Sequence, residues 1–405
     1  MGLNDGRSRA PVLFISTNDA TPWGGSEELW FETALRMAND GWPVIASVFK
    51  WPNRAAQLST LEAANVKVLE HGSIGIVSRL WHKAFPVQDH AWLGKLQPRP
   101  CFAFVSQGVN FDQATIDVGE TLLEQRVPYA IVSQSAFPWF WPADGLAIRS
   151  GNVLKRAAAS YFVSDMNLRL TRAQVGDPLS NGRVIRNPFH VDYDQPIPYP
   201  RGDVMKLACV GRLEPSVKGQ DLLLEALSSD IWKNRPLHVT FYGSGPNGEI
   251  IKRMQRAFDV RNATFGGHIP PQEIWRDNHA LVLSSRAEGL PIVVVEAMLS
   301  GRICIVTDAG GNSEVIEDGV TGFIARDISA AGIRNALERA WERRGEWQAM
   351  GEWAAESIRQ KVPRDPAGCL KQELEALING EQLSLIPVPL NGDATAGPSL
   401  RSCRG

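Results

Sequence analysis

KLACVGRLEPSVKG, residues 206–219, contains the pattern from which the fold class can be predicted. Lys206–Val210 is a short apolar run typical of a buried strand, and Gln220–Leu227, which follows the loop, has helical periodicity. A strand, a short loop and a helix form the repeating unit of parallel sheets with covering helices. The same alternation continues along the chain in both directions, so we expect an α/β protein.

Two runs of this alternation are separated by a segment with four prolines, residues 188–200, whose composition is typical of an extended linker. We therefore expect an N-terminal domain over residues 1–195 and a second domain over 196–345. Helices are expected over 346–378, which we consider as returning to the N-terminal domain. Residues 379–405 lack periodicity, and we expect them to be disordered.

The expected elements follow from short apolar runs and from helical spacing. Before the linker, strands are expected at Val12–Ser16, Val44–Phe49, Cys101–Val105, Tyr129–Val132, Tyr161–Val163 and Val184–Ile185. After Lys206–Val210, strands are expected at His238–Tyr242, Ala263–Phe265, Ala280–Leu283 and Ile303–Thr307, and helices at Glu249–Phe258 and Ile292–Leu299.

Composition excludes several classes of protein. The 405 residues include 42 Lys and Arg against 44 Asp and Glu, a net charge of -2, so no overall basic field attracts nucleic acid. The five cysteines are scattered without a C-x-x-C pair, which fits a reducing cytoplasm. No uncharged apolar stretch approaches the ~20 residues that cross a bilayer, and Met1–Ala10 is polar, so we expect a cytoplasmic protein.

Two loops could hold phosphate. Arg212 and Lys218 lie before a helix N-terminus, where backbone N–H groups add to their positive charge; the alternative is a pair of solvated cations neutralised by Glu214 or Asp221. Gly24 and Gly25 precede a helix expected from about Ser26, its candidate N-cap, to Asn39. These glycines let a ligand approach the backbone closely, or they form a turn without a ligand.

A third glycine loop has the spacing G-x-G-x-x-G at Gly243, Gly245 and Gly248. The literal interpretation is a dinucleotide site, which requires an acidic residue at the end of the following strand. Asp259 precedes that strand instead, so turn formation is the other interpretation.

Two glutamates stand eight residues apart in SSRAEGLPIVVVEAMLSG, residues 284–301. Pro291 suits the first position of a helix, which places Glu288 in the preceding loop and Glu296 inside the helix. The apolar run Ile292–Val295 indicates a buried helix, in which a carboxylate needs a polar partner. A capping Glu288 and a surface-facing Glu296 are the alternative.

Taken in order, these segments resemble the retaining GT-B glycosyltransferases of family four. The motifs are Gly-Arg-Leu followed by Lys218-Gly219, the glycine loop at Gly243, the Glu288–Glu296 pair, and a Gly-Gly-x-x-Glu segment that starts at Gly310 and leads to a turn ending at Gly322. The resemblance covers about residues 206–345 and is thinner in the N-terminal half. It implies two Rossmann-like domains that face each other across a cleft holding a nucleotide-sugar.

The resemblance also implies a role for each matching residue. Arg212 and Lys218 would bind the diphosphate, and Glu296 would accept hydrogen bonds from the ribose. Glu288, with the backbone at Gly289 and Leu290, would hold the transferred sugar. The remaining donor contacts would come from Gly243, Gly245, His268 and Ile269 near the nucleobase and from Gly24 and Gly25 near the phosphates.

Breaking a sugar–phosphate bond requires positive charge at the leaving diphosphate. The literal D-x-D, Asp192-Tyr193-Asp194, lies in the linker, remote in sequence from the phosphate candidates. Arg212, Lys218 and helix N-termini can supply the charge, so we expect no metal and no cofactor. The family's retaining stereochemistry is explained by front-face attack, in which the leaving phosphate helps to deprotonate the acceptor.

Two features of the N-terminal half bear on the acceptor. Many family members have a His where this sequence has Gln134, a side chain that can donate to a sugar hydroxyl but does not titrate. Residues 137–142, FPWFWP, are unusually aromatic, which suits an acceptor surface, although core packing is the commoner fate of Trp.

The expected function is transfer of a hexosyl unit from a nucleoside-diphosphate sugar to a glycan, lipid-linked or small-molecule acceptor, as in polysaccharide biosynthesis. Two alternatives stay open: an NAD(P)-dependent oxidoreductase that uses the Gly243 loop, and an inactive sugar-nucleotide-binding subunit. No nucleic acid partner is expected, and a weak peripheral association with the inner face of the membrane stays open.

Overall fold

The computed structural model describes residues 9–72, 91–381 and 383, which form two compact units. The first unit runs to Pro188 and resumes at Asp365; the second is Phe189–Arg364. The division falls at Pro188 rather than near residue 195. Of the helices expected over 346–378, α16 (Trp347–Lys361) belongs to the second unit and α17 (Pro366–Ile378) to the first. The tail expected to be disordered lies almost entirely outside the described residues.

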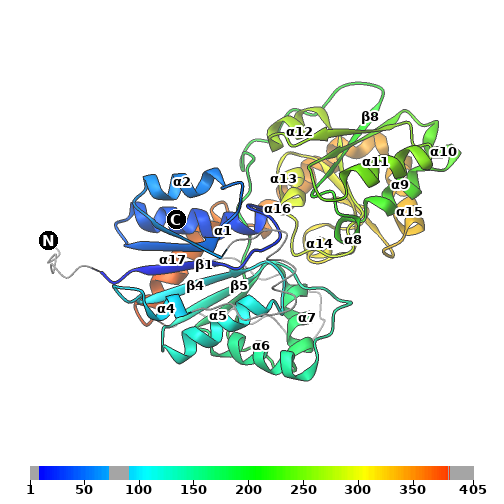
Figure 1. The fold of residues 1–405 in the computed structure, drawn as a ribbon. Helices are drawn as coiled ribbons and strands as arrows, with labels where there is room; N and C mark the ends of the chain where they lie inside the picture. The colour runs from blue at the N-terminus through cyan, green and yellow to red at the C-terminus, as the bar shows by residue number, and fades with distance from the viewer. Residues whose placement is uncertain (1–8, 73–90, 382, 384–405) are drawn as a thin grey trace. The chain divides into compact units, whose positions relative to one another are not determined.

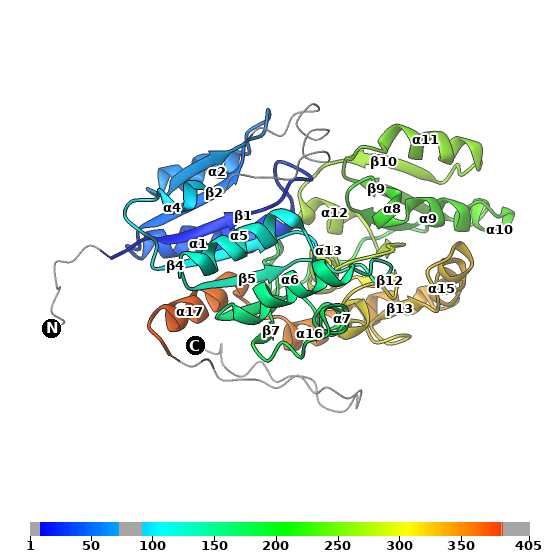
Figure 2. The same ribbon diagram turned by 60° about the horizontal axis from the view of Figure 1, so that its bottom comes forward.

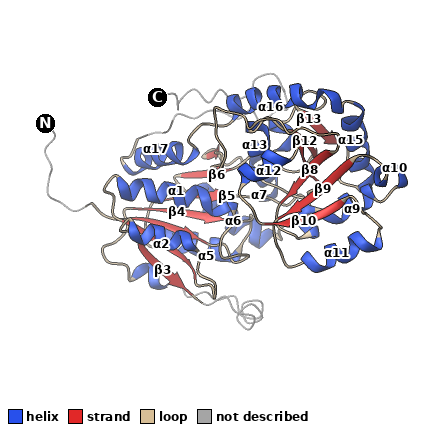
Figure 3. Ribbon diagram, turned by 90° about the horizontal axis from the view of Figure 1, so that it is seen from above, coloured by secondary structure: helices blue, strands red, loops and turns tan. Residues whose placement is uncertain are grey.

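The first unit is built on a parallel sheet of seven strands, shown with its helices in Figure 3. In spatial order the strands are β3 (Lys67–His71), β2 (Val44–Phe49), β1 (Val12–Ser16), β4 (Phe102–Gln107), β5 (Tyr129–Ser133), β6 (Ala159–Phe162) and β7 (Gly182–Val184). The helices are α1 (Gly25–Asn39), α2 (Ala56–Ala63), α4 (Ala91–Gly94), α5 (Gln113–Glu124), α6 (Asp144–Arg156), α7 (Asp165–Val175) and α17. The helices α5 and α6 lie side by side (Figure 2).

The second unit has a parallel sheet of six strands. Their order is β10 (Ala263–Gly267), β9 (Leu237–Tyr242), β8 (Met205–Val210), β11 (Ala280–Leu283), β12 (Ile303–Thr307) and β13 (Gly322–Ala325). Around it lie α8 (Pro215–Lys218), α9 (Gln220–Leu227), α10 (Asp230–Lys233), α11 (Gly248–Ala257), α12 (Pro271–Asp277), α13 (Ile292–Leu299), α14 (Asn312–Val315), α15 (Ala330–Glu342), the 3-10 turn η1 (Arg344–Glu346) and α16.

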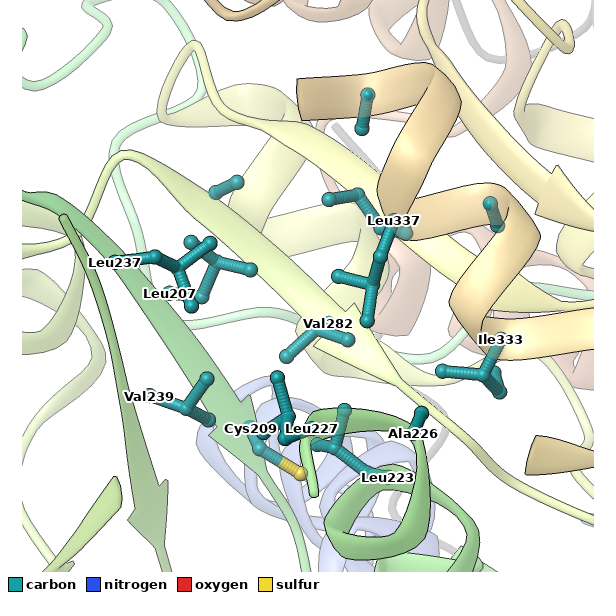
Figure 4. Packing of buried hydrophobic residues seen from close by; sticks show 14 of the residues in the cluster. Leu207, Cys209, Leu223, Ala226, Leu227, Leu237, Val239, Val282, Ile333 and Leu337 are labelled. Atoms are coloured by element: carbon teal, nitrogen blue, oxygen red, sulfur yellow. The ribbon is translucent and has the colours of Figure 1, made fainter. Parts of the chain in front are cut away.

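The core of the second unit explains why these segments form strands and helices. Leu207 of β8 and Val239 of β9 pack with Leu223 and Leu227 of α9 and with Leu337 of α15, and all five side chains are buried (Figure 4). Burial of a Leu or Val side chain stabilises the fold by roughly 1.5–3 kcal/mol. The apolar residues that recur every second position in the strands therefore pack against those that recur about every 3.6 positions in the helices, and together they form one apolar layer.

The last described helix completes the first unit. Helix α17 lies beside α1 (Figure 1), and its Leu370 and Leu374 are buried in the same cluster as Leu29 and Trp30 of α1. At the rim, the indole N–H of Trp42 donates to Glu375 at 2.9 Å. Asp365–Ile378 is thus a structural part of the first unit.

Several expected boundaries are confirmed, and two expected caps are wrong. The strands at 12–16, 44–49, 280–283 and 303–307 and the helix at 292–299 have the expected bounds. Gly24, not Ser26, is the N-cap of α1, and the Ser26 hydroxyl donates to Glu27 at 3.3 Å. Pro291 is the N-cap of α13 rather than its first helical residue. In the described part of the chain, no helix has the length and apolar character needed to span a bilayer.

Candidate functional site

The candidate site lies at a switch in strand order in the second sheet. The chain builds β8, β9 and β10 outward in one direction and then returns to place β11 on the other side of β8. Loops that leave the carboxyl ends of two such strands diverge, and ligands of open α/β sheets bind there. Lys218 follows β8 and Glu288 follows β11, so both come from this point of the sheet.

Lys218 and Glu288 are in direct contact. The ammonium of Lys218 donates to both carboxylate oxygens of Glu288, at 2.6 and 2.8 Å, and the hydroxyl of Ser285 donates to the same carboxylate at 2.6 Å. The Glu288 side chain is 8% exposed and that of Lys218 is 24% exposed. An ammonium has three donors, so Lys218 can bind one further acceptor while it holds Glu288.

Glycine at position 219 brings the two loops together. Gly219 has a φ of +63°, and a Cβ at this position would lie 1.9 Å from the carbonyl oxygen of Ser284. The hydroxyl of Ser284 donates to the Gly219 carbonyl at 2.7 Å. A second link is the bidentate pair of Arg286 with Asp221, both contacts at 2.7 Å. The position of Lys218 against Glu288 therefore depends on close contact between the loops.

Arg212 pairs with its neighbour in sequence rather than with the Lys218–Glu288 pair. Its guanidinium contacts Glu214 at 2.6 Å, and its side chain is 38% exposed. Of the two carboxylates considered as partners of this cation, Glu214 is the one that pairs with it. The other, Asp221, forms its ion pair with Arg286. The expected loop position holds for Arg212, but Lys218 is the last residue of the short helix α8.

The glycine loop after β9 is shaped by contact with its neighbouring loop. A Cβ on Gly243 would lie 2.2 Å from the carbonyl oxygen of Gly211, and one on Gly245 would lie 2.5 Å from that of Leu213. Backbone packing therefore explains these two glycines. Asp259, the acid considered for a dinucleotide ribose, is instead an exposed partner of Arg261 and Lys233.

The residues expected near a nucleobase follow β10, at the edge of the sheet, whereas those expected near the transferred sugar follow β11, on the far side of β9 and β8. After β10, His268 is exposed and Ile269 is half-buried. The N–H of Gly311 donates to the Gly289 carbonyl at 2.6 Å, and a Cβ on Gly310 would lie 2.4 Å from the Glu288 carbonyl. The Gly310–Gly311 segment thus fixes the backbone that carries Glu288, Gly289 and the buried Leu290.

Glu296 is buried in α13 and has a polar partner, as a carboxylate inside an apolar helix requires. It is 5% exposed, and its Oε1 accepts from the backbone N–H of His190 at 3.0 Å. The alternative of a surface-facing Glu296 is wrong.

The D-x-D of the linker forms a turn. Asp192 accepts from the backbone N–H groups of Asp194 and Gln195, both at 2.8 Å, and Asp194 pairs with Arg364. Over residues 9–72, 91–381 and 383, no group of three or more His, Cys, Asp or Glu is arranged to hold a metal ion.

Three expected site residues belong to the first unit. Gly24 caps α1 with its carbonyl, which accepts from the Glu27 N–H at 2.9 Å, and Gly25 is exposed. Gln134 is 7% exposed; its Oε1 accepts from the Asn187 amide at 2.7 Å, and its Nε2 has no hydrogen-bond partner among the described residues.

The sequence analysis missed a hollow beside α1. Its lining includes Trp23, Trp51 and Arg54, with the carboxylate of Glu27 next to Ser16. Glu27 is 3% exposed and accepts from the Ser16 hydroxyl at 2.6 Å and the Trp30 indole at 2.8 Å. Burial raises the pKa of Glu27 above its ordinary 4.5. Glu27 lies in the first turn of the helix expected from about Ser26, but helical periodicity does not show its burial, which depends on the strands around it.

Glu27→Gln should change how stability depends on pH. Above pH 4.5 the unfolded carboxyl loses its proton, whereas the folded one keeps it up to its raised pKa, so stability falls as pH rises through that window. The amide oxygen of Gln still accepts from Ser16 and Trp30. We expect the stability of E27Q relative to wild type to increase with pH, measured as urea midpoints between about pH 4 and pH 8.

Glu28→Gln is the control, because it removes the same charge from a half-buried neighbour on the same helix. Parallel pH profiles for wild type and E27Q would contradict the assignment.

Comparison with known proteins identifies the second unit. The family profile "Glycosyl transferases group 1" matches residues 205–343, the segment that carries Lys218, Glu288 and Glu296. This domain is a group 1 glycosyltransferase domain. The expected family is confirmed for the part of the chain that contains the candidate site.

Two curated proteins that are similar to part of this chain are named as sugar transferases. D-inositol 3-phosphate glycosyltransferase of Nocardia farcinica is 29% identical over 143 residues, which are 32% of this chain and 31% of that protein. A GDP-mannose-dependent alpha-(1-6)-phosphatidylinositol monomannoside mannosyltransferase of Mycolicibacterium smegmatis is 30% identical over 150 residues, 34% of this chain and 39% of the relative. The chain thus spans about a third of the length of these relatives.

A solved structure extends the likeness beyond the group 1 domain. HepE of Anabaena, solved in complex with UDP-glucose, superposes with a TM-score of 0.70 at 17% identity and covers 92% of this chain and all of its own. At this identity the likeness shows the fold. The expected α/β fold of the GT-B class, with two parallel sheets, is confirmed.

Proposed function

We propose that the protein is a retaining, metal-independent glycosyltransferase that moves a sugar from a nucleoside-diphosphate sugar to a glycan, lipid-linked or small-molecule acceptor. The observation that carries this proposal is the contact of Lys218 with Glu288 at the strand switch of a group 1 domain. One relative's name specifies GDP-mannose, and HepE was solved with UDP-glucose; both compounds are nucleoside-diphosphate sugars.

The leaving group sets the chemical requirement. When the bond from the sugar C1 to the phosphate oxygen breaks, negative charge develops on the diphosphate, and fixed positive charge lowers the barrier. Lys218 has donor capacity left for this charge, and Arg212 is exposed enough to turn from Glu214 to a phosphate. These cations, next to the start of α9, supply the charge that a metal provides in other enzymes.

The carboxylates would hold the rest of the donor. Glu288, fixed by Lys218 and Ser285, presents an acceptor for sugar hydroxyls, with the N–H groups of Gly289 and Leu290 beside it. Glu296 would accept from the ribose hydroxyls, and the Gly243–Gly245 loop with His268 and Ile269 would face the nucleobase. Gly24 and Gly25 would approach the phosphates, and Gln134 would donate to the sugar.

Retention follows from attack on the same face that the diphosphate leaves. The acceptor oxygen forms its bond to C1 as the C1–phosphate bond breaks, and the acceptor proton moves to the leaving phosphate oxygen. No protein nucleophile takes part. The residues named above bind and orient the donor and stabilise the departing charge.

Glu296→Gln tests the nucleotide part of the proposal. Gln keeps one oxygen for the His190 N–H and replaces the other with a donor, so the helix stays anchored while the ribose loses an acceptor. We expect UDP or GDP to bind about tenfold more weakly, a loss of ~1.4 kcal/mol measured by calorimetry.

The 2′,3′-dideoxy nucleotide is the control. It lacks the hydroxyls, so it should bind wild type and E296Q equally, which makes the two changes non-additive. Equal losses for both nucleotides would contradict a ribose contact, and binding of NADH in place of UDP and GDP would favour the oxidoreductase alternative.

Removal of metal tests the electrostatic argument. Release of nucleoside diphosphate from the donor should be unchanged by EDTA, because Arg212 and Lys218 provide the positive charge. Inhibition by EDTA that Mn²⁺ reverses would contradict metal independence. Donor binding without release under any acceptor, water included, would indicate an inactive binding subunit.

A further inference from the structure

The segment that follows β5 exposes large aromatic side chains. In this aromatic loop, residues 137–141, Trp139 is 55%, Phe140 41% and Trp141 63% exposed. Exposed clusters of large apolar side chains on a folded protein mark sites of interaction. The sequence analysis left two roles open for these aromatic residues, contact with an acceptor and packing in the core. The exposure of both Trp rings argues against core packing.

The aromatic loop is held in one conformation. The amide of Gln174 donates to the carbonyls of Phe137 and Phe140, at 3.1 and 2.7 Å, and the Phe140 N–H donates to the Phe137 carbonyl at 3.2 Å. Trp139 stacks on Phe137 with ring centroids 5.0 Å apart and planes 9° apart. A rigid surface binds with a smaller loss of conformational entropy than a mobile one, so these rings are organised for contact.

Buried amides with unused hydrogen-bonding atoms flank the aromatic loop. Gln134, directly after β5, is 7% exposed, and Gln174 is 4% exposed. The Nε2 of Gln134 and the Oε1 of Gln174 have no partner among the described residues. A backbone hydrogen bond from Asn110 to Ser135, 3.1 Å long, joins the loop after β4 to the one after β5. The exposed aromatic faces themselves match a ligand that has C–H faces, such as a sugar ring.

The charged side chains in the aromatic loop and its flanking residues bear on whether its partner is anionic or uncharged. Residues 135–148 contain one charged side chain, Asp144, and no Lys or Arg. An anionic lipid surface or an acidic polymer is attracted by basic residues, at about 1 kcal/mol for each Lys or Arg near the surface. Within this segment that attraction is missing, whereas α7, the helix that carries Gln174, has Arg172 and also Arg169, which pairs with Asp165. The aromatic loop itself therefore favours an uncharged partner.

We propose that the aromatic loop is a platform for a neutral oligosaccharide, whose sugar rings stack on Trp139 and Trp141. This inference rests on the proposed function, because it assigns the acceptor class of the same enzyme: a carbohydrate chain of several sugars rather than a single small molecule. Two exposed rings bind more of a chain than of one sugar, so affinity should rise with chain length.

Fluorine NMR of protein labelled with 5-fluorotryptophan tests the platform. The probes are glucose and three neutral hexasaccharides, maltohexaose, cellohexaose and chitohexaose. We expect the Trp139 and Trp141 signals to shift with at least one hexasaccharide and much less with glucose. Trp353 of α16, which is 52% exposed in the second unit, should not shift.

Variants separate stacking from general exposure. Replacing both loop residues, W139A/W141A, should weaken hexasaccharide binding by about tenfold or more, whereas W139F/W141F keeps aromatic faces and most of the affinity. W353A, the matched control, should bind as wild type does. Shifts at Trp353 equal to those in the loop would overturn the proposal.

Two further measurements separate this inference from the proposed function. If UDP or GDP still binds while no hexasaccharide shifts the Trp139 and Trp141 signals, the platform is wrong and the donor site stands. If neither nucleotide binds, the proposed function is wrong. Vesicles of phosphatidylcholine and phosphatidylglycerol in equal parts should leave both signals unchanged, and a shift with vesicles alone would overturn the saccharide assignment.

Discussion

Lys218→Met should lower the release of nucleoside diphosphate from the donor by about 10³-fold. The variant keeps the length of the side chain and removes the ammonium that contacts Glu288 and that we place at the diphosphate. It also leaves the buried Glu288 carboxylate with less compensation, so a loss of stability is expected as well. Turnover in a donor assay and thermal unfolding are measured together.

The double variant K218M/E288Q separates these two effects. Glutamine at 288 removes the uncompensated charge and can still accept from Ser285, so stability should recover towards that of wild type. Turnover should stay low, because the diphosphate still lacks its ammonium. Lys233→Ala, which removes an amine that pairs with Asp259 on the same unit, is the matched control. Recovery of turnover in the double variant would show that Lys218 is only a structural partner.

The largest expected effect on stability is at Gly219. Alanine there would place its Cβ 1.9 Å from the Ser284 carbonyl oxygen at a φ of +63°. The left-handed backbone costs Ala about 1–2 kcal/mol, and pushing two loops apart adds to it, so we expect a loss of about 3 kcal/mol or more in urea unfolding. Donor turnover should fall too, because Lys218 moves away from Glu288.

Gly319→Ala is the control for Gly219→Ala. Gly319 has a φ of +78° in the same unit, but a Cβ there would lie no closer than 3.9 Å to a neighbouring side chain, Arg343. It should lose only the backbone contribution, about 1–2 kcal/mol. Equal losses for the two variants would contradict the argument from close loop contact.

Sequence predicted five of the six strands in the sheet of the second unit, because these strands are continuous apolar runs bounded by turns, and it missed the edge strand β13 (Gly322–Ala325). The segments 280–283 and 303–307 could be delimited in this way. In the first unit, β3 (Lys67–His71) was missed because it is an edge strand of partly exposed residues, in which the apolar signal is weak.

The segments that carry the candidate site residues were predictable from sequence, but the partners of their side chains were not. The motif around Glu288 follows from resemblance, whereas its contact with Lys218 depends on how two loops approach each other. Arg212 could pair with Glu214 or Asp221, and the choice is settled by Arg286, which comes from another loop and occupies Asp221. The burial of Glu27 has the same origin, because neighbouring strands and not its own helix remove it from water.

The place of α17 in the first unit has a consequence for biosynthesis. A ribosome makes the strands of that unit first, then the whole of the second unit, and only afterwards the helix whose Leu370 and Leu374 cover α1. Residues 189–364 have their own core and can mature while the nascent chain is still growing. The earlier part keeps an uncovered apolar face around Leu29 and Trp30 until synthesis passes residue 374, so the half of the protein made first is the last to finish folding.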